Sequence, residues 1–131
     1  RVRVECGAVL SVQAGGVCWV EAEPRYLHRA LQNLVSNAMR HAEGRVLISC
    51  QVGYKRCRID VEDDGPGLTE DECREALKRG RRLDESRPGT GLGLSIVSEI
   101  CSEYGGSFSL EASRAGGLAA RMILPGLKAE T

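Results

Sequence analysis

The stretch Cys57-Arg-Ile-Asp-Val-Glu-Asp63-Asp-Gly-Pro-Gly67 decides how this chain folds, because it runs from a strand into a glycine turn. Alternation with a period of two places the apolar residues Cys57, Ile59 and Val61 on one face of the strand. Asp63 is the next residue of that inward series. A carboxylate directed at a core is costly unless another group pairs with it, so the stretch indicates that something binds Asp63 at the sheet edge.

Two interpretations of Asp63 are open on this stretch alone. The carboxylate can cap the backbone of its own turn, which the Asp-Asp-Gly-Pro-Gly sequence favours. It can also accept a hydrogen bond from the exocyclic amino group of adenine, with Gly65 and Gly67 leaving room for the flat ring. Three further motifs in the chain favour the second interpretation.

A helix precedes this strand in the sequence, and it carries the amide side chains of Asn33 and Asn37 four residues apart. Amide oxygens at that spacing share one helix face and suit a hard cation such as Mg²⁺. Because Mg²⁺ accepts few protein oxygens, Asn37 alone is enough as a ligand, and Asn33 then acts through a water or braces the site. Ordinary surface amides are the alternative.

The loop after the strand is cationic, with Arg79-Gly-Arg-Arg82 and then Arg87. A solvated charged loop is one interpretation, and neutralisation of a nucleotide's phosphates by Arg40, Arg82 and Arg87 is the other. A nucleic-acid surface is not favoured, because aromatic residues do not alternate with these arginines.

A glycine run, Gly89-Thr90-Gly91-Leu-Gly93-Leu, opens the next predicted helix. Its spacing fits neither the dinucleotide-binding fingerprint nor a Walker A loop. It can bring backbone N–H groups and a helix N-terminus against phosphate oxygens.

The two histidines are weaker candidates. His28 lacks a following acidic residue and is predicted to lie on a helix surface rather than to accept a phosphoryl group. His41 follows Arg40, and either a contact with phosphate or a cap on the helix end remains open.

Periodicity and turn residues predict the remaining elements. We expect helices over residues 24–42, 70–77 (with a Thr69/Glu72 capping box) and 94–104, and strands over residues 2–5, 17–21, 46–52, 56–63, 107–112 and 118–124. A mobile loop is expected over about residues 78–89.

The chain has 131 residues, a length typical of one domain. It carries 18 basic and 18 acidic side chains. A balanced charge creates no global field that attracts nucleic acid or an anionic membrane. The chain has no apolar run long enough to span a membrane and no signal peptide, and it is expected to be a soluble piece of a larger protein. Its six cysteines form no Cys-x-x-Cys motif, so reduced thiols such as Cys50 and Cys57 are expected within the core.

Together these motifs resemble the catalytic ATP-binding domain of a bacterial sensor histidine kinase, in the GHKL (Bergerat-fold) ATPase superfamily. Residues 31–42 match the family's N box, residues 61–68 its G1 box and residues 88–94 its G2 box, and the loop is similar to the lid of PhoQ-type kinases. The resemblance implies an α+β two-layer sandwich, with a mixed, mostly antiparallel sheet packed on about three helices and a mobile ATP lid. Residues 1–131 would form this single domain.

The resemblance also implies site residues. Asn37 would bind Mg²⁺ with Asn33 beside it, and these two, with Arg40, would be the catalytic residues. The nucleotide would be bound by Asn37, Arg40, His41, Asp63, Gly65, Gly67, Leu68, Arg82, Arg87, Gly89, Thr90, Gly91, Leu92, Gly93 and Leu94.

The implied activity is transfer of the γ-phosphoryl group of ATP to a histidine on the parent kinase's dimerisation hairpin. That hairpin is absent from this sequence, so the fragment is not expected to autophosphorylate alone. It would be a cytoplasmic monomer, and its parent a homodimer anchored in the bacterial inner membrane that signals to a response regulator and binds no nucleic acid. Hydrolytic relatives carry a Glu where this chain has Asn33, so slow hydrolysis is expected. A GHKL serine kinase or hydrolase, and a degenerate docking module, are the competing interpretations.

Overall fold

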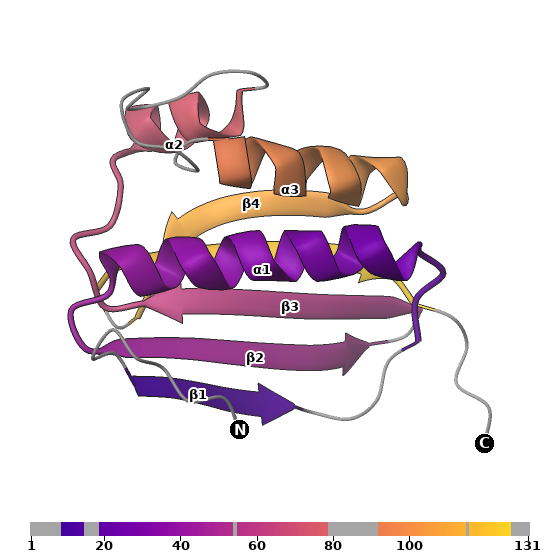
Figure 1. Cartoon of the computed structure of the whole chain (residues 1–131), viewed down its shortest axis with the longest axis horizontal. Helices are drawn as coiled ribbons and strands as arrows, with labels where there is room; N and C mark the ends of the chain where they lie inside the picture. Colours follow the sequence, from indigo (N-terminus) through magenta and orange to yellow (C-terminus); the bar gives the residue numbers. More distant parts are fainter. Residues whose placement is uncertain (1–8, 15–18, 54, 79–91, 115, 127–131) are drawn as a thin grey trace.

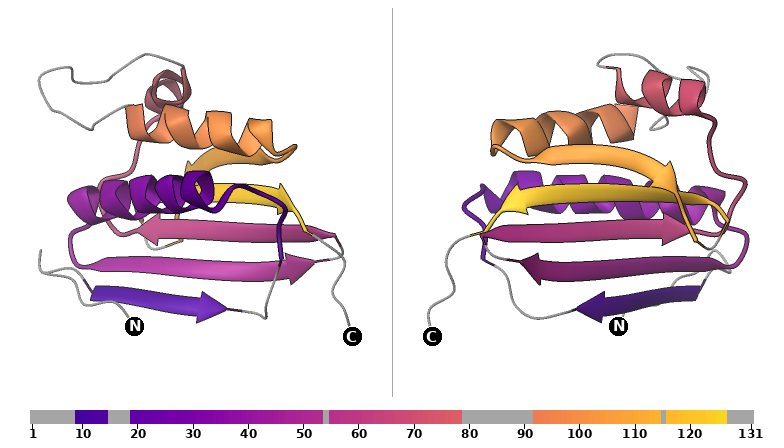
Figure 2. Two further views of the ribbon diagram at one scale, coloured as in Figure 1. Left: turned by 45° about the vertical axis from the view of Figure 1, so that its right-hand side comes forward. Right: turned by 180° about the vertical axis from the view of Figure 1, so that it is seen from behind.

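The computed structural model describes residues 9–14, 19–53, 55–78, 92–114 and 116–126, which form one sheet and three helices (Figure 1). In chain order the elements are β1 (Val9–Ala14), α1 (Pro24–His41), β2 (Arg45–Gly53), β3 (Arg56–Asp63), α2 (Glu70–Leu77), α3 (Leu92–Glu103), β4 (Ser107–Ala112) and β5 (Leu118–Pro125). Helices α1 and α3 cover one face of the sheet, and α2 packs beside α3 (Figures 1 and 2). The predicted two-layer α+β sandwich is confirmed.

The sheet has the strand order β1-β2-β3-β5-β4. Strand β1 runs parallel to β2, and all the other pairs in this sheet are antiparallel. A parallel pair needs a crossover connection, which α1 supplies between β1 and β2. The sheet is therefore mixed and mostly antiparallel, as the sequence predicts.

The N-terminal strands differ from the prediction. The expected strand over residues 2–5 lies outside the described residues and stays a prediction, and the structure has a further strand, β1 at Val9–Ala14, that the sequence analysis did not predict. Of the expected strand over residues 17–21, the described part makes only an isolated bridge between Val20 and Gly126. Strand β1 is placed by its pairing with β2, in which Val9 lies opposite Arg45, and the sequence does not show this pairing.

Helix α1 positions most of the candidate site. Pro24 is its first residue, where a missing N–H costs nothing, and Ala30, Leu34 and Ala38 form its buried stripe. They join a core cluster with the buried residues of α3 and the sheet. Asn33 and Asn37 lie on the flank of this stripe and are half-buried.

Helix α2 begins with the predicted capping box. The Thr69 hydroxyl accepts from the backbone N–H of Glu72, and the Glu72 carboxylate accepts from the backbone N–H of Thr69. Two backbone donors at the helix start are satisfied in this way.

The sheet face that carries no helices holds an ion network that the sequence analysis missed. Asp60 on β3 is only 5% exposed, because Arg58 binds its Oδ2 at 3.1 Å and Arg121 binds its Oδ1 at 3.0 Å. Arg121 also reaches Glu111 on β4 at 2.9 Å. Alternation in β3 predicts this outward position for Asp60, but the cross-strand partners depend on register.

Candidate functional site

The carboxylate of Asp63 lies at the C-terminal end of β3 and is 3% exposed. Its Oδ1 accepts hydrogen bonds from the backbone N–H groups of Gly65 at 2.9 Å and Leu118 at 3.3 Å. The structure thus contains the backbone cap that the first interpretation required. In the described part of the chain both bonds go to Oδ1, so Oδ2 remains available to a ligand.

Close backbone packing around Asp63 depends on glycines. A Cβ atom at Gly65 would fall on the carbonyl group of His41 at the end of α1. A Cβ at Gly117 would fall on the backbone and carboxylate oxygens of Asp63. Gly67 has a φ of +74° and packs against Gly117, so the end of α1, the turn after β3 and the start of β5 meet here.

Gly117 is a residue that the sequence analysis missed. The glycine pair before the last strand is the signal that could have found it, because adjacent glycines often mark a close backbone approach. Its contact with Asp63 follows from the pairing of β3 with β5, which the sequence does not show.

Asp64 was also missed, and it organises the neighbouring turn. Its Oδ1 accepts from the backbone N–H groups of Glu43, Gly44 and Arg45, at 2.9, 3.0 and 3.1 Å. These bonds, led by the one from Gly44, lower the pKa of Asp64 below its ordinary value. Asp64 therefore fixes the connection between α1 and β2 next to Asp63.

The other end of the candidate site lies where α1 meets the first turn of α3. The side-chain nitrogen of Asn33 donates to the backbone carbonyl of Gly93 at 3.5 Å, and Gly93 packs against the Asn33 side chain. This contact joins the two helices and holds the N-terminus of α3 beside α1. Arg40 and His41 lie exposed in the last turn of α1, where the His41 carbonyl approaches Gly65 next to Asp63.

The donor set at this end suits a magnesium nucleotide. Asn37 offers a half-buried amide oxygen one helical turn from Asn33, and the N-terminus of α3 attracts anions. Within the described ranges, no three His, Cys, Asp or Glu side chains are grouped to hold a metal. The prediction of a metal site therefore rests on the amides.

One predicted site residue, Leu94, has a buried side chain, and several others lie outside the residues that the structure describes. Leu94 is 4% exposed and its side chain packs in the core cluster rather than in an open site. Leu68 is half-buried after the Asp63 turn, and Leu92 begins α3. The predicted residues that fall outside the described ranges are Arg82, Arg87, Gly89, Thr90 and Gly91.

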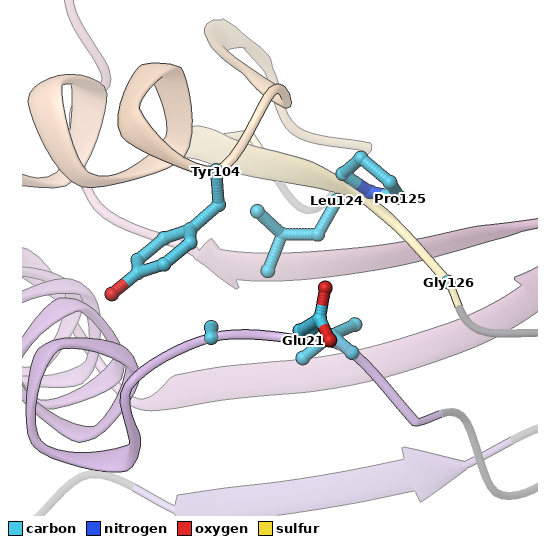
Figure 3. Close-up of a pocket in the computed structure, with 7 residues that line it drawn as sticks. Glu21, Tyr104, Leu124, Pro125 and Gly126 are labelled. Atoms are coloured by element: carbon cyan, nitrogen blue, oxygen red, sulfur yellow. The ribbon is translucent and has the colours of Figure 1, made fainter.

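A small hollow of about 160 Å³ lies elsewhere, between the segment before α1 and the ends of α3 and β5 (Figure 3). Leu124 and Pro125 form one of its walls, and Tyr104 another. The Tyr104 hydroxyl accepts from the backbone N–H of Glu23 at 3.0 Å. The segment before α1 lines this hollow, whereas Asn37 lies near the last residue of α1 and Asp63 ends β3 beside Gly65 and the His41 carbonyl.

No helix in the described ranges combines the length and the apolar character that crossing a membrane requires.

Comparison with known proteins gives a consistent result. A sequence model of one family, described as histidine kinase-, DNA gyrase B-, and HSP90-like ATPase, matches residues 22–128. The sensor protein kinase CarS of Pseudomonas aeruginosa is 43% identical over 95 residues, which are 72% of this chain and 21% of CarS. The two-component sensor PhoQ of the same organism is 37% identical over 103 residues, which are 79% of this chain and 23% of PhoQ. The chain thus spans about a fifth of the length of these relatives.

Among solved structures, the nucleotide-free catalytic domain of the histidine kinase ThkA has a TM-score of 0.80 with this chain. The two are 27% identical, and the match covers 92% of this chain and 81% of that domain. The arrangement of helices on a mixed sheet is therefore shared with a kinase catalytic domain.

Proposed function

The chain belongs to the histidine kinase-, DNA gyrase B- and HSP90-like ATPase family, and we propose that it binds Mg-ATP and donates the γ-phosphoryl group to a histidine. Its relatives are sensor histidine kinases, which are enzymes. The observation that carries the proposal is the buried carboxylate of Asp63, with Oδ1 bound to the backbone and Oδ2 left for a ligand.

At the base end, Asp63 accepts the adenine amino group through Oδ2. Two backbone N–H groups already orient the carboxylate, so little conformational freedom is lost when the base binds. Gly65 and Gly67 shape the slot for the ring, and Leu68 lines it.

At the phosphate end, Asn37 provides the amide oxygen for Mg²⁺, and Asn33 braces the helices through its bond to Gly93. Bound Mg²⁺ neutralises part of the phosphate charge. Arg40 and His41 contact phosphate from α1, and the backbone N–H groups of Gly93 and Leu94 contribute the helix N-terminus. The site is completed by Arg82 and Arg87 of the lid, by Gly89, Thr90 and Gly91 of the glycine run, and by Leu92 at the start of α3.

The proposed catalysis consists of positioning and charge neutralisation, because an amide at Asn33 cannot act as a base that activates water. The phosphoryl group therefore passes to an imidazole rather than to water. The acceptor histidine lies on the dimerisation hairpin of the parent protein, which carries the signal on to a response regulator. We propose that residues 1–131 form one cytoplasmic, monomeric catalytic domain of a dimeric parent held in the inner membrane.

The test is a transfer assay that mixes this chain with purified hairpin domains from related sensor kinases and ATP labelled at the γ-phosphate. We expect label on the hairpin's histidine, and no label on a hairpin whose acceptor histidine is replaced by alanine. A folded chain that labels none of several hairpins would contradict phosphoryl transfer and favour a docking module.

A further inference from the structure

We propose that the hydrogen bond between Ser113 and Glu62 positions the Asp63 carboxylate and thereby sets the preference for a 6-amino over a 6-oxo purine. The inference rests on the proposed function, because it concerns how the same site selects its base. Neither Ser113 nor Glu62 is placed against the nucleotide, so both act as positioning residues.

The bond ties two strands together across a third. The Ser113 hydroxyl donates to Oε1 of Glu62 at 2.9 Å, and Ser113 is only 8% exposed. Glu62 belongs to β3, and Ser113 follows the end of β4. Because β5 lies between β3 and β4, the bond passes over the first residues of β5.

Each end of this bond is close to a group that holds Asp63. Glu62 directly precedes Asp63 on β3. Ser113 closes the turn into β5, since its N–H donates to the carbonyl of Gly117 at 2.8 Å and its carbonyl accepts from Gly116 at 3.0 Å. The residue after Gly117 is Leu118, whose N–H donates to Asp63 Oδ1.

The packing makes Asp63 sensitive to small shifts of this turn. Gly117 lies so close to Asp63 that no Cβ fits between them. The bond from Leu118 is already long at 3.3 Å, so a small outward movement of β5 breaks it. The carboxylate then keeps only its bond from Gly65, and its orientation is less fixed.

A fixed carboxylate discriminates between purines by hydrogen-bond type. A 6-amino group donates to Asp63, whereas a 6-oxo group is an acceptor and leaves the carboxylate unpaired. A less fixed carboxylate binds the 6-amino group more weakly and can turn away from the 6-oxo group. Loss of the Ser113–Glu62 bond therefore reduces the preference for the 6-amino purine.

The experiment measures the Kd values of ADP and IDP by calorimetry, together with the free energy of unfolding, for four variants. Ser113→Ala and Glu62→Ala remove the bond, and Glu62→Gln keeps an acceptor oxygen. Ser109→Ala is the matched control, because Ser109 donates to Glu111 at 3.3 Å in an exposed bond within the edge strand β4.

We expect Ser113→Ala and Glu62→Ala to reduce the IDP-to-ADP ratio of Kd values by about threefold to tenfold, with Glu62→Gln and Ser109→Ala close to the wild type. An unchanged ratio in a folded Ser113→Ala or Glu62→Ala variant, even with lower stability, would overturn the inference. If Ser113→Ala does not fold, the comparison of Glu62→Ala with Glu62→Gln decides. Wild-type protein that binds neither nucleotide would instead refute the proposed function.

Discussion

Asp63 divides its two carboxylate oxygens between structure and ligand. Oδ1 binds the backbone of its own turn and of β5, so the sequence interpretation as a turn cap is confirmed. The adenine role stays a prediction, and the geometry makes the two roles compatible because the cap orients the group that would bind the base. An isolated motif cannot show this, since one of the two donors comes from Leu118, 55 residues away.

Replacement of Asp63 by alanine tests the adenine contact. We expect Asp63→Ala to weaken binding of ADP by at least tenfold, because a charge-assisted hydrogen bond contributes about 1.5–3 kcal/mol. Calorimetry measures the affinity, and Asp71→Ala on the exposed surface of α2 is the control. Unchanged affinity in folded Asp63→Ala protein would remove Asp63 from the adenine role.

The proposed role of the Asn37 amide as a Mg²⁺ ligand is tested by the magnesium dependence of nucleotide binding. We expect Asn37→Ala to abolish the Mg²⁺ dependence of ATP-analogue binding, because it removes the amide oxygen proposed as the ligand. Ser36→Ala, at the adjacent exposed position, should retain the dependence. If Asn37→Ala still binds the analogue more tightly with Mg²⁺, the metal is bound elsewhere.

The ends of elements, rather than their middles, build this site. The last turn of α1, the turn after β3 and the start of β5 meet at Gly65 and Gly117, where there is no room for side chains. At the other end, Asn33 joins α1 to the first turn of α3. The relative placement of α1, α3, β3 and β5 is thus held by backbone contacts and a few polar bonds.

Gly65→Ala tests the junction between α1 and the turn after β3. The new Cβ would meet the His41 carbonyl, so the turn must move, and we expect both lower unfolding free energy and weaker ADP binding. Gly53→Ala is the matched control, because the nearest atoms to its Cβ would be 4.0 Å away, on Arg56. If the two variants have the same unfolding free energy and the same affinity for ADP, the close approach at Gly65 is not needed for stability or binding.

The lowered pKa of Asp64 predicts a pH dependence for the turn that leads into β2. The ionised carboxylate is the stabilised form, so its contribution is full above the ordinary carboxyl value of 3.8 and is lost as the pH falls below it through the lowered pKa. We expect the stability difference between wild type and Asp64→Asn to be constant near neutral pH and to shrink in that acid range. Denaturant titrations at a series of pH values measure it, and a difference that is flat with pH would contradict the assignment.

Elements with strong local signals were predicted well from the sequence. Pro24 marks the first residue of α1, the Thr69/Glu72 capping box begins α2, and period-two alternation gives the bounds of β3. The missed strand β1 has a weaker local signal, and its place is selected by pairing with β2. Local patterns predict an element, but the pairing of strands far apart in the sequence depends on the whole fold.

The site residues that were predicted lie in local sequence patterns, whereas those that were missed act through contacts between distant segments. Motifs pointed to Asn33, Asn37 and Asp63 because each lies within a short recognisable pattern. Gly117 and Asp64 act through contacts between elements that depend on strand register, so the sequence alone did not indicate their roles. The lid residues Arg82 and Arg87 lie outside the described ranges and stay predictions.

Across the whole molecule, α1 spans the sheet (Figure 1). The segment before its first residue lines the hollow beside Tyr104, and its last turn meets Gly65 at the candidate nucleotide site. Its buried stripe fixes it to the sheet, and its flank presents Asn33 and Asn37 at the site end. Because acidic and basic residues balance over the chain, binding of a polyanion depends on local groups at this end. Similarity to the ThkA catalytic domain extends over 92% of the chain, so the two proteins share the placement of the helices on the sheet.

The most direct test of the central claim is calorimetric titration of a non-hydrolysable ATP analogue into this chain, with and without excess Mg²⁺. The account predicts binding with a Kd on the order of micromolar to sub-millimolar that depends on magnesium. Circular dichroism on the same sample confirms that the protein is folded. Absence of binding by folded protein would contradict the account and leave a docking role as the better explanation.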